Sequence, residues 1–275
     1  MILDGAVGTE LWGRGVSTAG PLWSGSAVRN APGVLAAIHR DYAAAGATVH
    51  TAATFRTKRR SARDAWEELT REAVAIAREA VPREHRVAGS VAPLEDCYRP
   101  DLAPLDLSLA AREHTELARA LAGAGVDLLL VETFASPEEA VVATESCVAT
   151  GVETWAALTA GPEGDLLTPS AMSDAARRCV EAGARAVLVN CTPATKTLPY
   201  VERLIAAKLG VPVGAYANAG GKGEGIGWLP TREAHAAARR YAELANRWVD
   251  AGAALIGGCC GTGPAHVEAV ARAFG

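Results

Sequence analysis

The 275-residue chain contains few aromatic residues and no cluster of basic ones. Phenylalanine, tyrosine and tryptophan together make up 5% of the sequence, and the formal net charge is −4. A protein that binds nucleic acid needs a basic surface that follows the phosphates, and this composition does not supply one. We therefore expect the partners of this protein to be small molecules and not nucleic acids.

Long apolar runs are also missing from the sequence. A membrane-spanning helix needs about 20 consecutive apolar residues, and no stretch of the chain approaches that length. The sequence starts Met1-Ile2-Leu3-Asp4, which leaves no room for a signal peptide and predicts a cytoplasmic protein. The composition carries no signal for a particular oligomeric state.

Six cysteines are present, and the most unusual are the adjacent Cys259 and Cys260. Glycines flank this pair, and the apolar run 253–256 before it is typical of a buried strand. A disulfide between neighbouring residues is strained, whereas two thiolates directed at one soft cation account for the pair. Zinc normally takes at least three protein ligands. Cys191, which follows the apolar run 186–189, is the candidate for the third.

Short apolar segments alternate regularly with helical patterns along the whole chain. Eight segments are expected to be strands: residues 2–3, 47–55, 87–92, 126–131, 154–159, 186–190, 211–215 and 253–257. Because these segments are apolar and β-branched, they suit a parallel sheet that is covered by helices. Eight such units in 275 residues predict an α/β fold, namely a single (β/α)8 TIM barrel over residues 1–275. A doubly wound open sheet is the alternative, although no Gly-x-Gly-x-x-Gly motif opens a helix after any of these segments.

Helices are expected between these strands. The run Ser136-Pro137-Glu138-Glu139 combines an N-cap serine, a proline at the first helical position and acidic residues in the first turn, so it predicts a helix start. The other helices are expected over residues 34–45, 58–80, 108–122, 170–182, 195–209, 231–251 and 264–274.

The carboxyl ends of the strands of a TIM barrel meet at one face, where the active site lies. Polar or glycine-rich residues occupy these predicted ends: Asp4, Thr54, Glu132, Cys191, Asn218, Cys259 and Cys260. The acid and the glycines of residues 4–9 indicate a site loop, with a plain turn as the alternative. Because Cys191 ends the sixth predicted strand and the cysteine pair ends the eighth, we expect the three thiols to lie close together.

Three thiolates on Zn²⁺ leave one tetrahedral position open, which is a feature of catalytic sites. Because the charges of the three ligands outweigh that of the ion, such a centre is a poor activator of water. It is suited to holding a substrate thiol as a thiolate, since a free thiol is mostly protonated at neutral pH and metal coordination removes its proton. The predicted reaction is attack by a bound thiolate on an electrophilic carbon.

Three motifs resemble the homocysteine S-methyltransferase family: Asp4-Gly5-Ala6-Val7-Gly8-Thr9-Glu10-Leu11, Val189-Asn190-Cys191-Thr192 and Gly257-Gly258-Cys259-Cys260-Gly261-Thr262. The match spans the whole chain, and it implies a zinc-dependent barrel that moves a methyl group onto homocysteine and forms methionine. By motif, Cys191, Cys259 and Cys260 match the zinc ligands. Asp4, Gly5 and Glu132 match positions at the amino-acid end of homocysteine, and Thr54 and Asn218 are further candidates for substrate contacts.

The sequence departs from the family pattern at the end of the second predicted strand. Many relatives have a Glu-Thr-Asn-Thr-aromatic-Gln-like run there, where this chain has Thr51-Ala52-Ala53-Thr54-Phe55-Arg56. The roles of Arg56 and of Cys97, in the loop after the third strand, stay open.

The methyl donor is expected to be a small sulfonium compound, S-methylmethionine or S-adenosylmethionine, because the chain shows no added cobalamin or folate domain. A betaine- or methylfolate-dependent enzyme is one alternative. A non-catalytic zinc- or thiol-binding barrel is the other.

Overall fold

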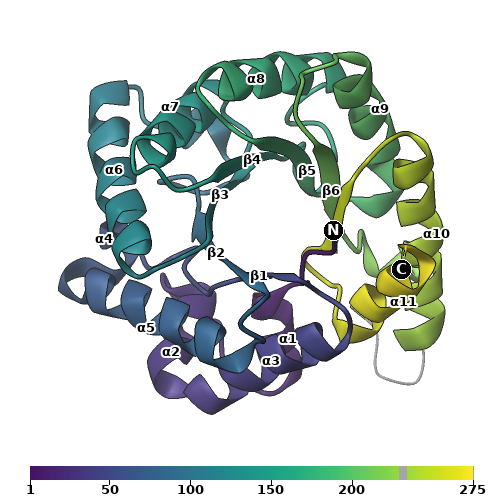
Figure 1. Cartoon of the computed structure of the whole chain (residues 1–275), viewed down its shortest axis with the longest axis horizontal. Helices are drawn as coiled ribbons and strands as arrows, with labels where there is room; N and C mark the ends of the chain where they lie inside the picture. Colours follow the sequence, from purple (N-terminus) through teal and green to yellow (C-terminus); the bar gives the residue numbers. More distant parts are fainter. Residues whose placement is uncertain (229–233, 275) are drawn as a thin grey trace.

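The structure is a computed structural model in which residues 1–228 and 234–274 are described. Within these residues, seven parallel strands form one sheet whose order follows the sequence. The strands are β1 (Val49–Thr51), β2 (Arg86–Val91), β3 (Leu128–Phe134), β4 (Thr154–Leu158), β5 (Ala186–Pro193), β6 (Val213–Asn218) and β7 (Leu255–Gly258). The sheet curls into a ring with the helices around its outside (Figure 1). The predicted α/β class is confirmed, and the fold is TIM-barrel-like.

The helices cover the outer face of the sheet. They are α1 (Val7–Gly13), α2 (Ala27–Asn30), α3 (Pro32–Ala44), α4 (Arg59–Ala62), α5 (Trp66–Ala80), α6 (Leu107–Gly123), α7 (Pro137–Val148), α8 (Pro169–Glu181), α9 (Leu198–Ala206), α10 (Ala234–Asp250) and α11 (Pro264–Phe274). Ser136 caps α7 as predicted, because its hydroxyl accepts a hydrogen bond from the backbone N–H of Glu139. The start of the helix predicted over 231–251 lies outside the described residues. No helix in the described part of the chain is long and apolar enough to cross a membrane.

The N-terminal residues lie between β1 and β7, the two ends of the sheet. Ile2 forms an isolated parallel bridge with Ile256 of β7, and Leu3 forms one with Val49 of β1. The N–H of Leu3 donates to the carbonyl oxygen of Ile256 at 2.8 Å. The first predicted strand is therefore present as two bridges and not as a ladder. We call residues 1–4 the seam segment.

Both faces of the sheet are buried. Inside the ring, the apolar side chains include Leu3, Val49, Leu128, Leu130, Leu188 and Leu255. On the outside, Leu129 and Val131 of β3 pack in a second core under the helices. Successive residues of a strand point to opposite faces. A strand that is buried on both faces therefore reads as a continuous apolar run, which is the pattern that located these strands in the sequence.

Several predicted boundaries were wrong, and three of them have a clear reason in the structure. The strand predicted over 47–55 ends at Thr51, because the chain turns there and the N–H of Thr54 donates to the carbonyl oxygen of Ala52 at 2.6 Å. The helix predicted over 58–80 is divided into α4 and α5 at Arg63, whose φ is 51°. The loop predicted over 4–9 is shorter, because α1 begins at Val7. An amphipathic pattern continues across such single-residue breaks and does not reveal them.

Candidate functional site

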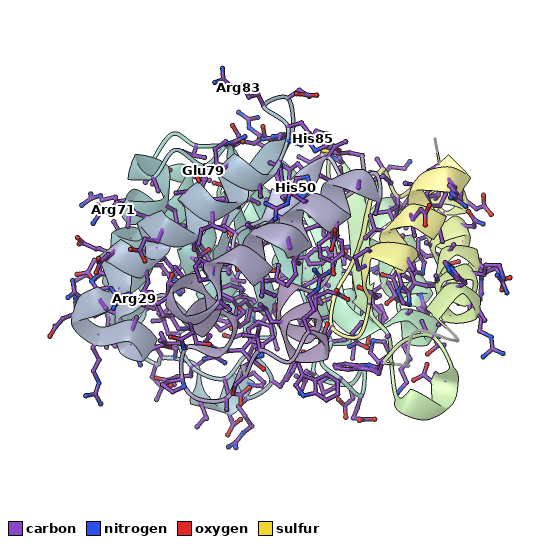
Figure 2. All side chains as sticks on the ribbon, turned by 90° about the horizontal axis from the view of Figure 1, so that it is seen from below. Arg29, His50, Arg71, Glu79, Arg83 and His85 are labelled. Carbon is purple, nitrogen blue, oxygen red and sulfur yellow. The ribbon has the colours of Figure 1, made fainter. Side chains whose placement is uncertain are left out.

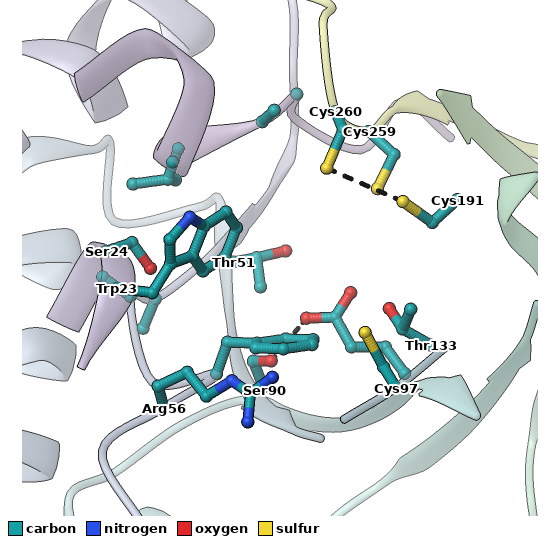
Figure 3. Close-up of a pocket in the computed structure, with 18 of the residues that line it drawn as sticks. Trp23, Ser24, Thr51, Arg56, Ser90, Cys97, Thr133, Cys191, Cys259 and Cys260 are labelled. Atoms are coloured by element: carbon teal, nitrogen blue, oxygen red, sulfur yellow. Dashed lines mark hydrogen bonds between the residues drawn. The ribbon is translucent and has the colours of Figure 1, made fainter. Parts of the chain in front are cut away.

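The carboxyl ends of the strands surround a cavity of about 620 Å³. Its walls come from the seam segment, the loops after β1 and β2, the ends of β3 and β5, and the residues that follow β7. In Figure 3 the sulfur atoms of Cys191, Cys259 and Cys260 lie together on one side of this cavity, and Arg56 lies on the opposite side. The cavity has the size of a small-molecule site.

The structure brings together the three cysteines that the sequence singled out. Cys191 belongs to β5, Cys259 and Cys260 follow β7, and their three Sγ atoms lie within 4.8 Å of one another. The Sγ atoms of Cys191 and Cys260 are 3.7 Å apart. We call these three residues the cysteine cluster. Three sulfur atoms in this arrangement are a donor set for a soft metal ion such as zinc.

Backbone geometry fixes the position of the cysteine cluster. Cys191 has a φ of 46°, a left-handed conformation that is uncommon outside glycine, and Nδ2 of Asn218 donates to its carbonyl oxygen at 2.8 Å. A Cβ at Gly258 would lie 2.2 Å from Oγ1 of Thr262, so only glycine fits there. The hydroxyl of Thr262 donates to the carbonyl oxygen of Cys259 at 2.7 Å and closes the turn that carries the pair.

One thiol of the cluster is favoured as the thiolate. Hydrogen bonds from Cys259 and Cys260 hold the pKa of Cys191 well below its ordinary value. The same contacts with Cys191 hold the pKa values of Cys259 and Cys260 well above theirs. A cation that binds all three sulfur atoms would therefore displace protons from the pair.

Tyr98 contacts the cysteine cluster, which the sequence did not indicate. It lies in the loop after β2, and its hydroxyl oxygen is 2.9 Å from Sγ of Cys191. Burial raises the pKa of Tyr98 above its ordinary value, so the phenol stays protonated. The hydroxyl can therefore donate a hydrogen bond to the Cys191 thiolate.

Replacing Tyr98 with phenylalanine is expected to lower the affinity of the cysteine cluster for metal about 10- to 100-fold, because the hydroxyl supports a ligand sulfur. Competition between the protein and a coloured chelator measures this affinity. Tyr200→Phe is the matched control, since the Tyr200 hydroxyl donates to the carbonyl oxygens of Gly164 and Leu167 and does not reach the cysteines. An unchanged affinity in Tyr98→Phe would show that the hydroxyl does not support the cluster.

Two buried carboxylates face the same cavity. Glu132 of β3 accepts hydrogen bonds from the hydroxyls of Ser90 and Tyr216, the latter at 3.0 Å. Asp4 accepts hydrogen bonds from the N–H and the hydroxyl of Thr51 at 2.8 and 3.2 Å. Burial raises the pKa of Glu132 to about 7 and that of Asp4 well above its ordinary value. Among the described side chains of residues 1–221, 223–228 and 235–274, neither carboxylate has an ion-pair partner, so a positively charged group of a ligand would fit beside them.

The other three predicted site residues differ in position. Gly5 lines the cavity, and a Cβ there would lie 2.7 Å from the hydroxyl oxygen of Tyr42. Thr54 and Asn218 lie outside the cavity lining. The Thr54 hydroxyl donates to the carbonyl oxygen of Ser90 at 3.0 Å, and Asn218 holds the cysteine cluster as described above. These two side chains position the backbone around the site.

Arg56 and Cys97, whose roles the sequence left open, both line the cavity. Burial raises the pKa of Cys97 to about 12, so its thiol stays protonated. The guanidinium of Arg56 lies over the ring of Phe55, with 5.5 Å between Cζ and the ring centroid.

A group of histidines lies behind Asp4. One ligand atom each from Asp4, His39 and His50 lies within 4.8 Å of the other two. Burial lowers the pKa of His39 to about 4 and that of His50 to about 3, so both imidazoles are neutral. Nε2 of His50 is 3.0 Å from Nδ1 of His85, and Figure 2 shows these two imidazoles side by side. This histidine group is a second place where the described residues could hold a metal ion.

Together, the TIM-barrel-like fold, the cysteine cluster and the two buried carboxylates define a class of protein. It is an α/β protein whose cavity places a possible metal site of three thiols beside two buried carboxyl groups.

Comparison with known proteins identifies the family within this class. Residues 1–274 match the homocysteine S-methyltransferase family. Homocysteine S-methyltransferase 4 of Zea mays is 31% identical to this chain, over 99% of the chain and 88% of the relative. S-methylmethionine–homocysteine S-methyltransferase BHMT2 of Pongo abelii is 31% identical, over 99% of the chain and 77% of the relative. The metallated form of the homocysteine methyltransferase MmuM from Escherichia coli matches with a TM-score of 0.82 and 26% identity, over 99% of this chain and 96% of that one.

This chain therefore belongs to the homocysteine S-methyltransferase family, and it is a methyltransferase. The resemblance inferred from the sequence motifs is confirmed. The cysteine cluster, together with the metallated form of the Escherichia coli protein, indicates that the chain binds a metal.

Proposed function

We propose that this protein transfers a methyl group from a sulfonium donor, S-methylmethionine or S-adenosylmethionine, to the thiol of L-homocysteine and forms methionine. The observation that carries the proposal is the cysteine cluster in a cavity that also contains the carboxylates of Glu132 and Asp4. A sulfur-rich metal site beside buried carboxylates fits a substrate with both a thiol and an ammonium group. Homocysteine has both.

We further propose that Cys191, Cys259 and Cys260 hold Zn²⁺. Three thiolates suit zinc, and a site with three protein ligands would leave room for a substrate to bind the ion. When bound, the ion supplies the acidity that keeps the homocysteine thiol deprotonated at neutral pH. A hydrogen bond from Tyr98 to Cys191 stabilises the negative charge that gathers on the ligand sulfurs.

The protein's own side chains would orient homocysteine. Glu132, which the hydroxyls of Ser90 and Tyr216 hold in place, accepts hydrogen bonds from the substrate ammonium group. Asp4 and Gly5 form the adjoining wall of the cavity.

Methyl transfer forms a bond between the homocysteine sulfur and the methyl carbon while the bond from that carbon to the donor sulfur breaks. The donor sulfonium leaves as a neutral thioether. Holding the three atoms in line can contribute about 7–11 kcal/mol to lowering the barrier. The cavity walls would provide this alignment.

We also propose that residues 1–275 form one domain, in which the seam segment serves as the eighth strand of a (β/α)8 barrel. The bridges from Ile2 to β7 and from Leu3 to β1 support this arrangement. All six cysteines are free. That state fits a reducing compartment, so we propose a cytoplasmic location.

Zinc-loaded protein is expected to form methionine from homocysteine with S-methylmethionine or S-adenosylmethionine, and not with betaine or a methylfolate. A thiolate that attacks a positively charged sulfur neutralises both charges in the transition state. The negative charge of the cysteine cluster would also attract a cationic donor. The Pongo abelii relative is named for S-methylmethionine, which supports this choice. Mass spectrometry of methionine formed with each donor in turn tests it.

Other results of this experiment would support one of the alternative functions. Methionine formed only with betaine or with a methylfolate would contradict the proposed sulfonium donor and support homocysteine as the acceptor. No methionine with any donor, from protein that carries its full zinc content, would favour a non-catalytic zinc-binding barrel. A reaction without protein corrects for uncatalysed transfer.

A further inference from the structure

The cavity has one basic side chain, Arg56, among the described residues that line it. Its lining includes three acidic residues, Asp4, Glu132 and Asp96. No ion pair within the described ranges 1–228 and 234–274 includes Arg56. Its guanidinium is therefore available to an anionic group of a molecule in the cavity.

The nearby arginines are engaged differently. Arg59 pairs with Glu116 at 3.1 Å, and Arg60 pairs with Glu113 at 2.6 Å. Both lie outside the cavity lining, in or next to helix α4. Arg56 is thus distinguished from its neighbours both by where it lies and by the lack of a carboxylate partner in the described structure.

Packing fixes the direction of Arg56. Its guanidinium lies over the ring of Phe55, and Phe55 meets Trp23 edge-on with 5.6 Å between ring centroids. Nη1 of Arg56 donates to the carbonyl oxygen of Glu95 at 3.4 Å. Because a guanidinium has five N–H groups, most of its donors remain free to bind a carboxylate in the paired geometry that arginine favours.

We propose that Arg56 binds the carboxylate group of the methyl donor. This inference rests on the proposed function, in which the cysteine cluster holds the homocysteine sulfur. In-line transfer requires the donor to extend away from that sulfur, and Arg56 lies on the side of the cavity opposite the cysteines (Figure 3).

The same arrangement defines the substrate class. The donor is a sulfonium that also carries a carboxylate, as an amino acid does. The aromatic residues Trp23 and Phe55 also line the cavity, and aromatic rings attract cationic groups such as a sulfonium. A cavity of about 620 Å³ has room for such a donor together with homocysteine.

Calorimetric titration of zinc-loaded protein with S-methylmethionine tests the proposal without turnover. Arg56→Gln is expected to weaken binding about 10- to 100-fold, because a hydrogen-bonded charge pair is lost, and Arg56→Lys is expected to keep part of the affinity. Homocysteine binding should be the same in all three proteins. Arg59→Gln is the matched control, because Arg59 lies three positions away and pairs with a surface glutamate; it should bind both ligands normally.

A donor that lacks a carboxylate tests the same contact from the ligand's side. Trimethylsulfonium has no carboxylate, so wild type and Arg56→Gln should use it equally well for methionine formation. Thermal unfolding shows whether each variant is folded.

Three results would overturn the proposal. They are unchanged S-methylmethionine binding in Arg56→Gln, equal weakening of homocysteine and S-methylmethionine, and no binding of S-methylmethionine to wild type. A protein that binds S-methylmethionine through Arg56 and yet forms no methionine would support this inference and contradict the proposed function.

Discussion

Cys260→Ala protein is expected to form no detectable methionine and to lose the zinc that the wild type binds, about one ion per chain. Removing one of three thiolates leaves two protein ligands, fewer than catalytic zinc sites use. The homocysteine thiol would then stay protonated at neutral pH. The fold is expected to persist, because Cys260 belongs to neither of the two apolar cores around the sheet.

Elemental analysis and methionine formation are measured on the same preparation. X-ray absorption of the wild type should give zinc–sulfur distances of about 2.3 Å. Cys147→Ala, which changes a buried cysteine of α7, is the control and should keep both zinc and activity. Full zinc content in Cys260→Ala would contradict the assignment and point to the group of Asp4, His39 and His50.

Glu132→Gln is expected to raise the KM for homocysteine about 10- to 150-fold, since loss of a charged hydrogen-bond partner costs about 1.5–3 kcal/mol. The KM for the methyl donor should change far less, because the donor lies on the other side of the transferred methyl group. Steady-state kinetics with each substrate varied in turn gives both constants. Glu138→Gln, which removes an exposed carboxylate of α7 that pairs with Arg178, should change neither. An unchanged homocysteine KM in Glu132→Gln would mean that Glu132 serves the donor or the scaffold.

The raised pKa of Glu132 predicts that the affinity for homocysteine depends on pH. Burial raises the pKa of Glu132 to about 7, so its carboxyl group is protonated below that pH and ionised above it. An ammonium group needs the ionised form, and homocysteine affinity is therefore expected to fall as pH decreases below 7, by up to about tenfold per pH unit. The Glu132→Gln protein lacks this titration. Titration of the homocysteine thiol affects both proteins alike, so the ratio of their KM values isolates Glu132. A ratio that does not vary with pH would contradict the assignment.

The sequence revealed the cysteine cluster because its residues are unusual for their positions. Cys259 and Cys260 are adjacent, lie between glycines and follow an apolar run, and Cys191 follows another such run. Parallel strands end at the same face of a sheet, so this order alone placed the three thiols together. The contact from Tyr98 to Cys191 could not be predicted in this way, because the path of the loop after β2 depends on packing between residues that are distant in sequence.

Thr54 and Asn218 show that a position at the end of a strand is not enough to predict a substrate contact. Both were predicted to contact substrate because they follow apolar segments, and both hold backbone carbonyl oxygens in the structure. A position at the end of a strand does not specify the direction of a side chain where the chain leaves the sheet. The chain turns tightly from Ala52 to Thr54, and Asn218 reaches the carbonyl oxygen of the left-handed residue Cys191; neither feature has a sequence signal.

The seam segment affects when the sheet can close during synthesis of the chain. The backbone nitrogen of Met1 donates to the carbonyl oxygen of Ala254 at 3.0 Å, across 253 positions of the sequence. The carbonyl oxygen of Asp4 accepts a hydrogen bond from the N–H of Gly258 at 3.0 Å, next to the cysteine pair. Contacts this distant in sequence carry a loop-closure entropy cost and slow folding. A growing chain on the ribosome therefore has an open edge at β1 until β7 has emerged, and its three clustered thiols can meet only after translation has passed Cys260.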